Sequence, residues 1–460
     1  MANQCVIRLM RELRQLEEDD DIGRQNEIYD VNIRDVEALI IGPPGTPYAM
    51  GFYQFQIKFP PGKVVTRDLT ADLAQGLAMD PELIPLDYPE KPPLVALRTT
   101  NSGTTRFGPN LYACGKVCLS ILGTWISGPN EQWNPVQGLA TVLRSIQSLL
   151  DEKPVKLEPG FENHSRVEES EAYNAKIHHE NLRVTVIQPL EASFRDTEGQ
   201  PTQEPSRDPN GETKQYQQAS PFLDMLKRRF LWYLESYKMA IDKGLKDHRS
   251  PKGGRFTLMS FEYGSNAMKG RWDYEDLKMR IERLETQIMD EIHSWPRRGL
   301  EAERQGACIA VRLRAQFEKL VPELTERTEG MVCLELVDNN PFLWRLIYHG
   351  RPMTQYDGGV LKAKIYISPN HPAEQPRVFL ETPLYHVRVS PQNALIYLPL
   401  ETENIGQHID GIISSLEEER PPVNPLMTVN PAASALCWGS PQEQRQYRRN
   451  LRRSVEATLE

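Results

Sequence analysis

The segment Gly115–Trp125 reads GKVCLSILGTW and places a single cysteine, Cys118, among apolar residues. In an arbitrary protein such a thiol is most often a small buried side chain. The same group also serves as a metal ligand or, once deprotonated, as a nucleophile. Cys114 forms a Cys-x-x-x-Cys pattern with it, but no second Cys/His pair stands at zinc spacing, which disfavours a metal site. The surrounding residues must decide between the other two roles.

The composition is ordinary for a globular protein of two or three domains, with 460 residues of which 39% are apolar and 25% charged. No run approaches the roughly 18 apolar residues that span a bilayer, and the N-terminus lacks a secretion-signal pattern. Six scattered cysteines argue against a disulfide scaffold. The net charge of −9 gives no nucleic-acid footprint, and the arginines at 445–453 are typical of a solvated helix face. We expect a cytoplasmic or nuclear protein without nucleic-acid or membrane partners.

Upstream of Cys118 the pattern changes from helical to extended. Apolar residues about three apart predict a helix over 6–18. From Ile28 to Thr99, the runs EALIIG, YQFQIKF and LVALRT are separated by Gly- and Pro-rich turns, which predicts an antiparallel meander. Downstream, PVQGLATVLRSIQSLL (135–150) returns to a helical period, and the proline in its first turn suits a helix start.

The middle of the chain separates two structured parts. Residues 191–220 contain almost nothing that could be buried, which predicts a flexible linker. Two helical apolar stripes follow, around 226–241 and 277–295. Such stripes are typical of helices that pack on each other or on a neighbouring domain.

One pattern occurs twice in the chain. Gly42-x-Pro44-x-Thr46-x-Tyr48-x-x-Gly51 returns with identical spacing at 350–359, and each copy runs into a strand. The match between the two copies resumes where YPEKPP aligns with HPAEQP. It continues through the end of a predicted helix in each copy. The sequence therefore predicts one fold twice, at about 1–190 and 330–460.

The two copies differ in one interval. In the first copy 27 residues separate Pro60 from Tyr88, whereas the second has only two residues there, so the first carries an insertion at about 61–87. This insertion is moderately polar and shows no clear period. A surface excursion is the physical interpretation, because a buried irregular loop leaves backbone groups unpaired. Translated non-coding sequence is the alternative.

The surroundings of Cys118 resemble the core of the ubiquitin-conjugating enzymes. Pro109-Asn110 lies eight residues before the cysteine, Leu119 follows it, and Trp133-x-Pro135 begins fifteen residues after it. The family pattern is His-Pro-Asn, then Gly-x-Ile/Val-Cys-Leu, then Trp-x-Pro. The likeness covers about residues 5–155.

A narrower likeness points to the Z-type members of that family. CLSILGTW, SIQSLL, EPGF, FLWYLESY and WDYEDLKMRIERL carry it to about residue 295. The resemblance implies an α+β architecture, the UBC fold, made of an N-terminal helix, a four-stranded antiparallel sheet and C-terminal helices. Together with the repeat, this predicts the fold twice, joined by a helical extension. The expected parts are a catalytic UBC core at 1–190, the linker at 191–220, the helical extension at 221–325 and an inactive UBC-like domain at 326–460.

The resemblance also implies a chemistry. Cys118 would accept ubiquitin or a ubiquitin-like modifier as a thioester from an activating enzyme and pass it to a substrate lysine, alone or with a ligase. Sulfur suits both steps, since it is a good nucleophile and a good leaving group. To Asn110 the family assigns oxyanion or loop stabilisation, and one such donor contributes roughly 3–4 kcal/mol. No metal or nucleotide cofactor is implied, because ATP is consumed by the activating enzyme.

A neutral lysine is needed for transfer, so an acidic side chain near the cysteine would help to position and deprotonate it. Glu158, in the loop after the helix, is the candidate by rough position. Asp151 and Glu152 are close in sequence and remain alternatives.

Several residues depart from the family pattern. Gly108 stands where the family has histidine, which predicts a less rigid rim of the site, and Glu90 stands where many RING-binding members carry an aromatic residue. The intact set of Asn110, Cys118 and Trp133 favours an active enzyme over the alternative, a non-catalytic adaptor of the ubiquitin pathway. The second copy has no cysteine between residues 334 and 436, so it cannot form a thioester. For that copy, a binding role and a structural remnant stay equally open.

Overall fold

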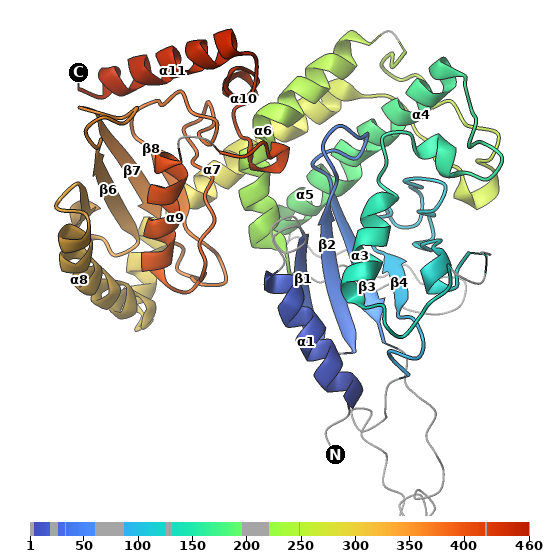
Figure 1. Cartoon of the computed structure of the whole chain (residues 1–460), viewed down its shortest axis with the longest axis horizontal. Helices are drawn as coiled ribbons and strands as arrows, with labels where there is room; N and C mark the ends of the chain where they lie inside the picture. Colours follow the sequence, from blue (N-terminus) through green and yellow to red (C-terminus); the bar gives the residue numbers. More distant parts are fainter. Residues whose placement is uncertain are drawn as a thin grey trace, which may run out of the picture. The chain divides into compact units, whose positions relative to one another are not determined.

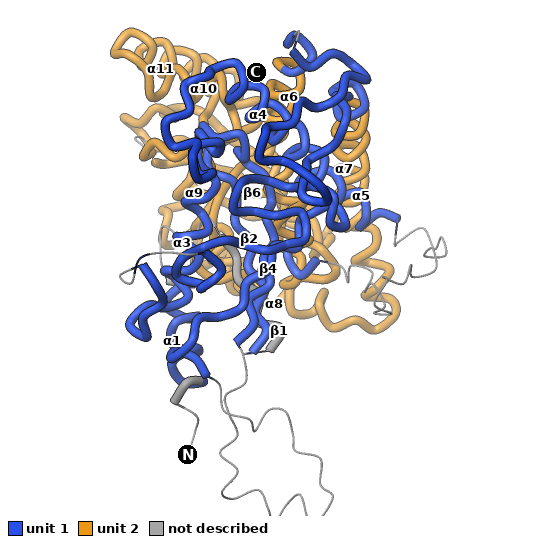
Figure 2. Tube along the Cα trace, turned by 90° about the vertical axis from the view of Figure 1, so that its right-hand side faces the viewer, with its two compact units in different colours: residues 1–222, 244–277 blue, residues 223–243, 278–460 orange. Residues whose placement is uncertain are grey.

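The computed structural model describes residues 4–18, 26–32, 34–59, 87–125, 128, 131–195, 220–247, 249–418 and 421–459. The chain packs into two compact units, unit 1 with residues 1–222 and 244–277, and unit 2 with residues 223–243 and 278–460 (Figure 2). The predicted insertion and most of the predicted linker lie outside the described residues. The predicted division of the chain into four parts stays a prediction. In the structure, residues of the predicted helical extension belong partly to unit 1 and partly to unit 2.

Unit 1 is built on an antiparallel sheet whose four strands pair in chain order (Figure 1). The strands are β1 Asn26–Asn32, β2 Asp35–Ile41, β3 Phe52–Lys58 and β4 Leu94–Leu97. Apolar and aromatic side chains of β2 and β3 are buried, as expected for residues that favour a pleated, packed surface. The predicted meander is confirmed, and so is the N-terminal helix, α1 (Gln4–Glu18).

The helix predicted over 135–150 is shorter than expected. Helix α3 comprises Leu139–Ser148, and Pro135 lies in the turn before it, so the predicted helix start at this proline is wrong. The physical reason is Asn134, whose side-chain oxygen accepts a backbone N–H two residues further on at 3.0 Å and so forms a competing local turn. The first N–H of α3 instead donates to the Glu12 carboxylate of α1 at 2.9 Å.

The remaining helices of unit 1 follow α3 along the chain. They are α4 Val167–Glu180, a π-helical stretch Asn181–Ile187 and α5 Gln188–Arg195. Unit 1 also includes the connection between the next two helices, which is mostly irregular and contains a short 3₁₀ turn at Gly264–Asn266. This connection belongs to the predicted helical extension but packs within the unit that contains Cys118.

Unit 2 contains a second four-stranded antiparallel sheet with the same strand order (Figure 1). Its strands are β5 Val332–Leu336, β6 Leu343–His349, β7 Val360–Tyr366 and β8 Arg377–Leu380. Its helices are most of α6 Leu223–Lys246 and of α7 Tyr274–Arg304, then α8 Ile309–Arg327, α9 Ile405–Glu417, α10 Pro431–Cys437 and α11 Pro441–Glu456. The predicted apolar stripes of α6 and α7 are buried.

The repeated glycine pattern forms the same turn in both units. The N–H of Gly42 and that of Gly350 each donate to the carbonyl of the glycine that ends the pattern, at 2.8 and 2.9 Å. A Cβ added at Gly42 would lie 1.7 Å from the Tyr48 carbonyl oxygen, and one added at Gly350 would lie 1.6 Å from that of Tyr356. Only glycine allows this close approach of the chain to itself.

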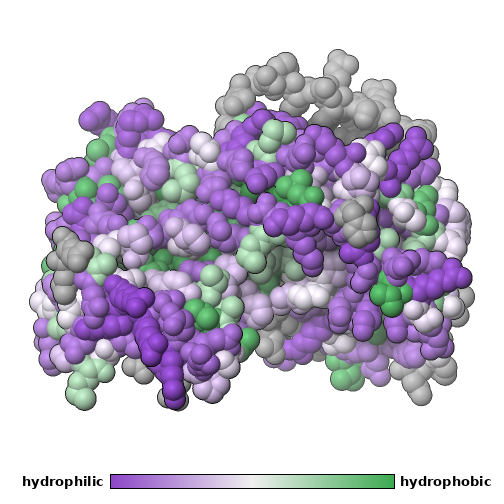
Figure 3. Space-filling model, turned by 90° about the horizontal axis from the view of Figure 1, so that it is seen from above, coloured by the Kyte–Doolittle hydropathy of each residue, from purple (hydrophilic) through white to green (hydrophobic). Residues whose placement is uncertain are grey.

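The surface visible in Figure 3 shows hydrophobic residues scattered among hydrophilic ones. Isolated exposed apolar residues of this kind are ordinary on protein surfaces. Among the helices of the described ranges, none is long and apolar enough to cross a membrane.

Candidate functional site

Cys118 ends a loop that is held against β4; we call residues 106–118 the Cys118 loop. Ala96 of β4 forms an antiparallel bridge with Lys116. Gly115 has a φ of +89°, and a Cβ added there would lie 2.7 Å from the Leu97 carbonyl oxygen. Glycine is therefore required where the Cys118 loop approaches β4.

Asn110 and Cys118 are joined by two hydrogen bonds. The Cys118 N–H donates to the Asn110 carbonyl at 2.9 Å, and Asn110 Nδ2 donates to the Cys118 carbonyl at 3.0 Å. In the described part of the chain, the buried Asn110 Oδ1 has no hydrogen-bond partner. The Asn110 amide group thus supports the loop through its contact with the Cys118 carbonyl.

The thiol of Cys118 is buried, with 1% of the residue exposed. Burial raises its pKa, and this shift is opposed by the positive charge of Lys116, a hydrogen bond with Tyr112 and the charge of Arg106. These three groups favour the thiolate, which is the form that attacks a carbonyl.

These three neighbours of the sulfur are not identified from the sequence. The Tyr112 ring centroid lies 5.0 Å from the Arg106 guanidinium carbon and 5.8 Å from Lys116 Nζ. The two-residue spacing of Lys116 and Cys118 is the signal that could have placed Lys116 beside the thiol, whereas a turn separates Tyr112 from both. No local pattern singles out Arg106.

Glu158 lies close to the Cys118 loop. Its Oε2 is 3.5 Å from the Arg106 guanidinium, and its side chain is 24% exposed. Burial raises its pKa, while Arg106 opposes the shift. The two alternatives, Asp151 and Glu152, are exposed, and Asp151 accepts the Lys153 N–H at 2.7 Å in a local turn. Within the described ranges, Glu158 is the one carboxylate of the three for which the structure gives a contact with the Cys118 loop.

Gly108 is buried, and a side chain there would require the Tyr48 hydroxyl to shift. A Cβ added there would lie 3.1 Å from the Tyr48 hydroxyl, which itself donates to the Phe107 carbonyl at 2.7 Å. Arg106 donates to the carbonyls of Gly108 at 2.9 Å and of Pro109 at 3.0 Å. The carbonyls of residues 107, 108 and 109 therefore each accept a side-chain hydrogen bond. The sequence, by contrast, predicts a less rigid rim of the site.

Trp133, the tryptophan of the Trp-x-Pro motif, supports the turn that precedes β4. Its Nε1 donates to the Pro89 carbonyl at 2.7 Å, and its ring centroid lies 5.9 Å from that of Tyr88. The Tyr88 hydroxyl donates to the Glu12 carboxylate at 2.5 Å. This motif residue therefore has a packing role in unit 1.

Unit 2 contains a loop with the same backbone pattern at residues 384–396, which we call the second loop. Phe379 of β8 forms an antiparallel bridge with Ala394. The Ile396 N–H donates to the Arg388 carbonyl at 2.9 Å, as the Cys118 N–H does to its partner in unit 1. Ile396 is fully buried.

Matching these bridges and hydrogen bonds pairs the side chains of the two loops. Ile396 corresponds to Cys118, Arg388 to Asn110, His386 to Gly108 and Leu384 to Arg106. The sequence predicts only that this region lacks a cysteine, and the structure shows that Ile396 lies at the position that matches Cys118.

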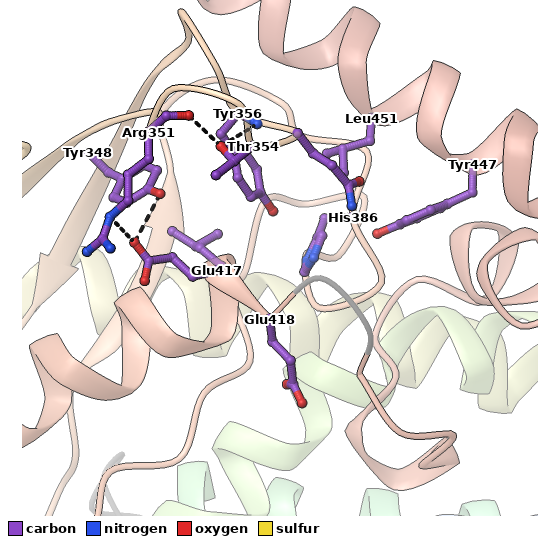
Figure 4. A pocket seen from close by; sticks show the side chains of 11 residues that line it. Tyr348, Arg351, Thr354, Tyr356, His386, Glu417, Glu418, Tyr447 and Leu451 are labelled. Carbon is purple, nitrogen blue, oxygen red and sulfur yellow. Dashed lines mark hydrogen bonds and ion pairs between the residues drawn. The ribbon is translucent and has the colours of Figure 1, made fainter.

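A cavity of about 230 Å³ lies beside the second loop (Figure 4). Its lining includes His386, Tyr356 and an ion pair between Arg351 and Glu417 at 3.0 Å. Burial lowers the pKa of His386 to about 3, so the imidazole is neutral at physiological pH. The lining contains no thiol, which leaves this cavity without a group that could form a thioester.

Comparison with known proteins finds a family model and several relatives that match this chain. The family model described as ubiquitin-conjugating enzyme matches residues 8–62, 82–180 and 312–431, more than half of the chain. The Homo sapiens protein named Ubiquitin-conjugating enzyme E2 Z is 33% identical over 293 residues, which are 64% of this chain and 66% of that protein. The Danio rerio protein of the same name is 31% identical over 289 residues, 63% of this chain and 70% of that protein.

A third relative is much longer than this chain. The Homo sapiens protein named Dual E2 ubiquitin-conjugating enzyme/E3 ubiquitin-protein ligase BIRC6 is 39% identical over 154 residues, which are 33% of this chain and 3% of that protein. The match to the human E2 Z protein spans just under two thirds of that relative's length. The ranges matched by the family model include Cys118, Asn110 and Glu158 as well as the second loop. On this basis the chain belongs to the ubiquitin-conjugating enzyme family.

Proposed function

We propose that this chain carries ubiquitin, or a ubiquitin-like modifier, as a thioester on Cys118 and transfers it to a substrate lysine. In loading, the Cys118 thiolate attacks the modifier's thioester carbonyl on the activating enzyme, a new S–C bond forms and the activating enzyme's thiolate leaves. In transfer, a neutral lysine amine attacks the same carbonyl, a C–N bond forms and Cys118 leaves as thiolate. The amine's proton passes to a base.

The observation that carries this proposal is the paired hydrogen bonding of Asn110 and Cys118. This pairing supports the proposal because it holds the Asn110 amide next to the cysteine that would carry the modifier, where a donor could stabilise the oxyanion of each tetrahedral intermediate. The nearby charges of Lys116 and Arg106 support it, because they favour the thiolate over the thiol.

Glu158 is our proposed acceptor for the lysine proton. Its raised pKa makes it a better base than an ordinary carboxylate, since a general base works best when its pKa approaches the working pH. Its partial exposure leaves it within reach of an incoming amine.

The proposed partners are ubiquitin or a ubiquitin-like protein, a ubiquitin-activating enzyme and, for some substrates, a ligase. The enzyme itself would need no cofactor, and we propose the cytoplasm or the nucleus as its location. Nucleic acid and membranes are not among the proposed partners.

For unit 2 we propose an inactive UBC-like copy. The matching strand order, the matching loop hydrogen bonds and the family match at 312–431 support this. Ile396 would stand at the position of the nucleophile, so unit 2 would have either a binding role or a structural role.

The test is to incubate the purified chain with an activating enzyme, ATP and ubiquitin, and to look for an adduct that a reducing agent cleaves. We expect an adduct in the wild type and in Cys114→Ala, the matched control at an exposed cysteine nearby, but not in Cys118→Ala. An adduct that survives Cys118→Ala contradicts the proposal.

The second candidate function is a non-catalytic adaptor, and the burial of the Cys118 thiol is the observation that favours it. The absence of an adduct with several activating enzymes and several modifiers, in a protein shown to be folded, would support this function instead.

A further inference from the structure

The guanidinium of Arg106 lies at the base of the Cys118 loop with only 3% of the residue exposed. A buried charge is costly unless it is both paired and hydrogen-bonded. Two of its N–H groups satisfy the carbonyls of Gly108 and Pro109, the two residues before Asn110. Arg106 therefore holds the backbone that leads into Asn110.

Besides the Tyr112 ring, two residues distant in sequence contact this guanidinium. Nη1 donates to the Phe261 carbonyl at 3.3 Å, and the Phe261 ring centroid lies 5.3 Å from Cζ. Nη2 lies 3.5 Å from Glu158. Phe261 belongs to residues 250–273, which connect α6 and α7 within unit 1 and which we call the extension segment.

The extension segment is itself firmly attached. Glu262 pairs with Lys176 of α4, and both side chains are fully buried. Glu262 also accepts the Met259 N–H at 2.8 Å, which closes a turn of the segment. Asn266 Oδ1 accepts the Ala113 N–H at 3.1 Å, a second contact with the Cys118 loop. The segment thus joins α4 to that loop.

We propose that Arg106 is a positioning residue through which the extension segment holds the backbone at Gly108–Asn110 in the geometry that lysine transfer requires. The inference rests on the proposed thioester function. It explains how the loop is braced without the family histidine: the Tyr48 hydroxyl crowds the place of a side chain at position 108, and a buried arginine holds the carbonyls instead.

Arg106 has two separable effects, one geometric and one electrostatic. Its planar guanidinium donates to two carbonyls at once, and a lysine keeps the charge but cannot make both hydrogen bonds in that geometry. Its charge lowers the pKa of Glu158, whose other titratable neighbours are Tyr112 and Tyr173. Arg106→Gln removes both effects, whereas Arg106→Lys removes the first.

The experiment loads the full-length chain with ubiquitin, removes the activating enzyme and follows discharge to free lysine between about pH 6 and 9. We expect discharge to slow by about 10- to 100-fold in Arg106→Lys and Arg106→Gln, since small displacements of catalytic groups have effects of this size. In Arg106→Gln alone, the decrease of the discharge rate at acid pH should begin at a higher pH than in the wild type, because Glu158 loses the charge that lowers its pKa.

Two further variants make the test specific. Asn266→Ala removes one hydrogen bond between the extension segment and the Cys118 loop and should slow discharge by roughly fivefold. Arg249→Lys changes a more exposed arginine of unit 1 that pairs with Asp247 and should leave discharge unchanged. Thermal unfolding of each variant reports whether it is folded.

The possible results are distinct. Unchanged discharge in folded Arg106→Lys and Asn266→Ala overturns the inference while leaving the thioester function intact. A second result also overturns the inference: Arg106→Gln discharges slowly with the pH dependence of the wild type, and Arg106→Lys discharges normally. Arg106 would then have only a structural role. Failure of the wild type to form an adduct overturns the proposed function first.

Discussion

The Cys118 loop of unit 1 and the second loop of unit 2 follow the same backbone pattern with different side chains. In unit 1 the carbonyls before Asn110 are held by a buried arginine. In unit 2 that arginine is replaced by Leu384, and His386 Nδ1 accepts the Arg388 N–H at 3.2 Å. The loop therefore forms with or without a thiol, because its bridges and ladder hydrogen bonds are made by the backbone. Only the chemistry depends on the side chains.

The two loops also differ in how they are supported from outside. The Cys118 loop has contacts with the extension segment, which a buried ion pair attaches to α4. In unit 2 the Arg388 side chain reaches Ser415 at 3.3 Å and pairs with Glu418, next to the end of α9. A position occupied by an amide donor in one loop thus carries a structural ion pair in the other.

The largest expected effect comes from trying to convert the second loop into the first. Ile396→Cys in a Cys118→Ala background should form no reducible ubiquitin adduct, because Arg388 occupies the position that matches the Asn110 amide donor. Adduct formation on a non-reducing gel is the measurement, and Ile396→Cys with Cys118 intact is the control that should still load. An adduct at position 396 would mean that the sulfur is the only functional difference between the loops.

The next effect concerns the support of the Cys118 loop. Lys176→Met leaves the Glu262 carboxylate buried without its cation and should lower the free energy of unfolding of unit 1 by about 3–5 kcal/mol. Hydrogen exchange resolved by peptide measures this separately for each unit. Lys252→Met, which breaks an exposed ion pair with Glu275, is the matched control and should show no measurable change. Equal effects of the two variants would contradict the buried pairing.

Asn110 and Arg388 offer a direct comparison between the loops. Asn110→Ala should slow lysine discharge about 100-fold, as expected for loss of a donor directed at an oxyanion. Arg388→Ala should leave discharge unchanged if unit 2 is the inactive copy that we propose. Single-turnover discharge of the preloaded chain measures both, and a comparable slowing by Arg388→Ala would show that the second loop participates.

The smallest expected effect is a pH dependence confined to unit 2. The folded pKa of His386, about 3, lies below the ordinary value of 6.5, so the unfolded chain binds the additional proton between these pH values. His386 should therefore contribute no loss of stability above pH 6.5 and a loss of about 2 kcal/mol at pH 5. Urea unfolding followed by peptide-resolved hydrogen exchange at pH 7 and pH 5 measures this loss.

The control for that pH dependence is His386→Asn, which removes the titrating ring and retains a hydrogen-bond acceptor. The same cavity contains Glu417 and Arg351, so the difference between the variant and the wild type isolates the histidine. An identical pH dependence in both proteins would contradict a buried, neutral imidazole.

Much of the architecture is predictable because the signals are local. Short apolar and aromatic runs between turns identify β2 and β3, and three- to four-residue spacing identifies α1, α6 and α7. The start of α3 is not predictable in the same way. There Asn134 forms a local turn, and a carboxylate from another helix, Glu12, accepts the first N–H. A contact between helices is not visible in the spacing of one of them.

By itself, the sequence determined the repeated turn, the order of strands and the placement of Asn110 eight residues before Cys118, because each depends on spacing along the chain. Only the tertiary structure decided which residue of the second loop lies at the position that matches Cys118, which of three acidic residues lies near the Cys118 loop, and that Arg106 donates to two carbonyls of that loop. The physical reason is that Arg106 is held by Phe261, 155 positions away. A buried charge is satisfied by whichever groups the fold brings within hydrogen-bonding distance, and no local pattern records that distance.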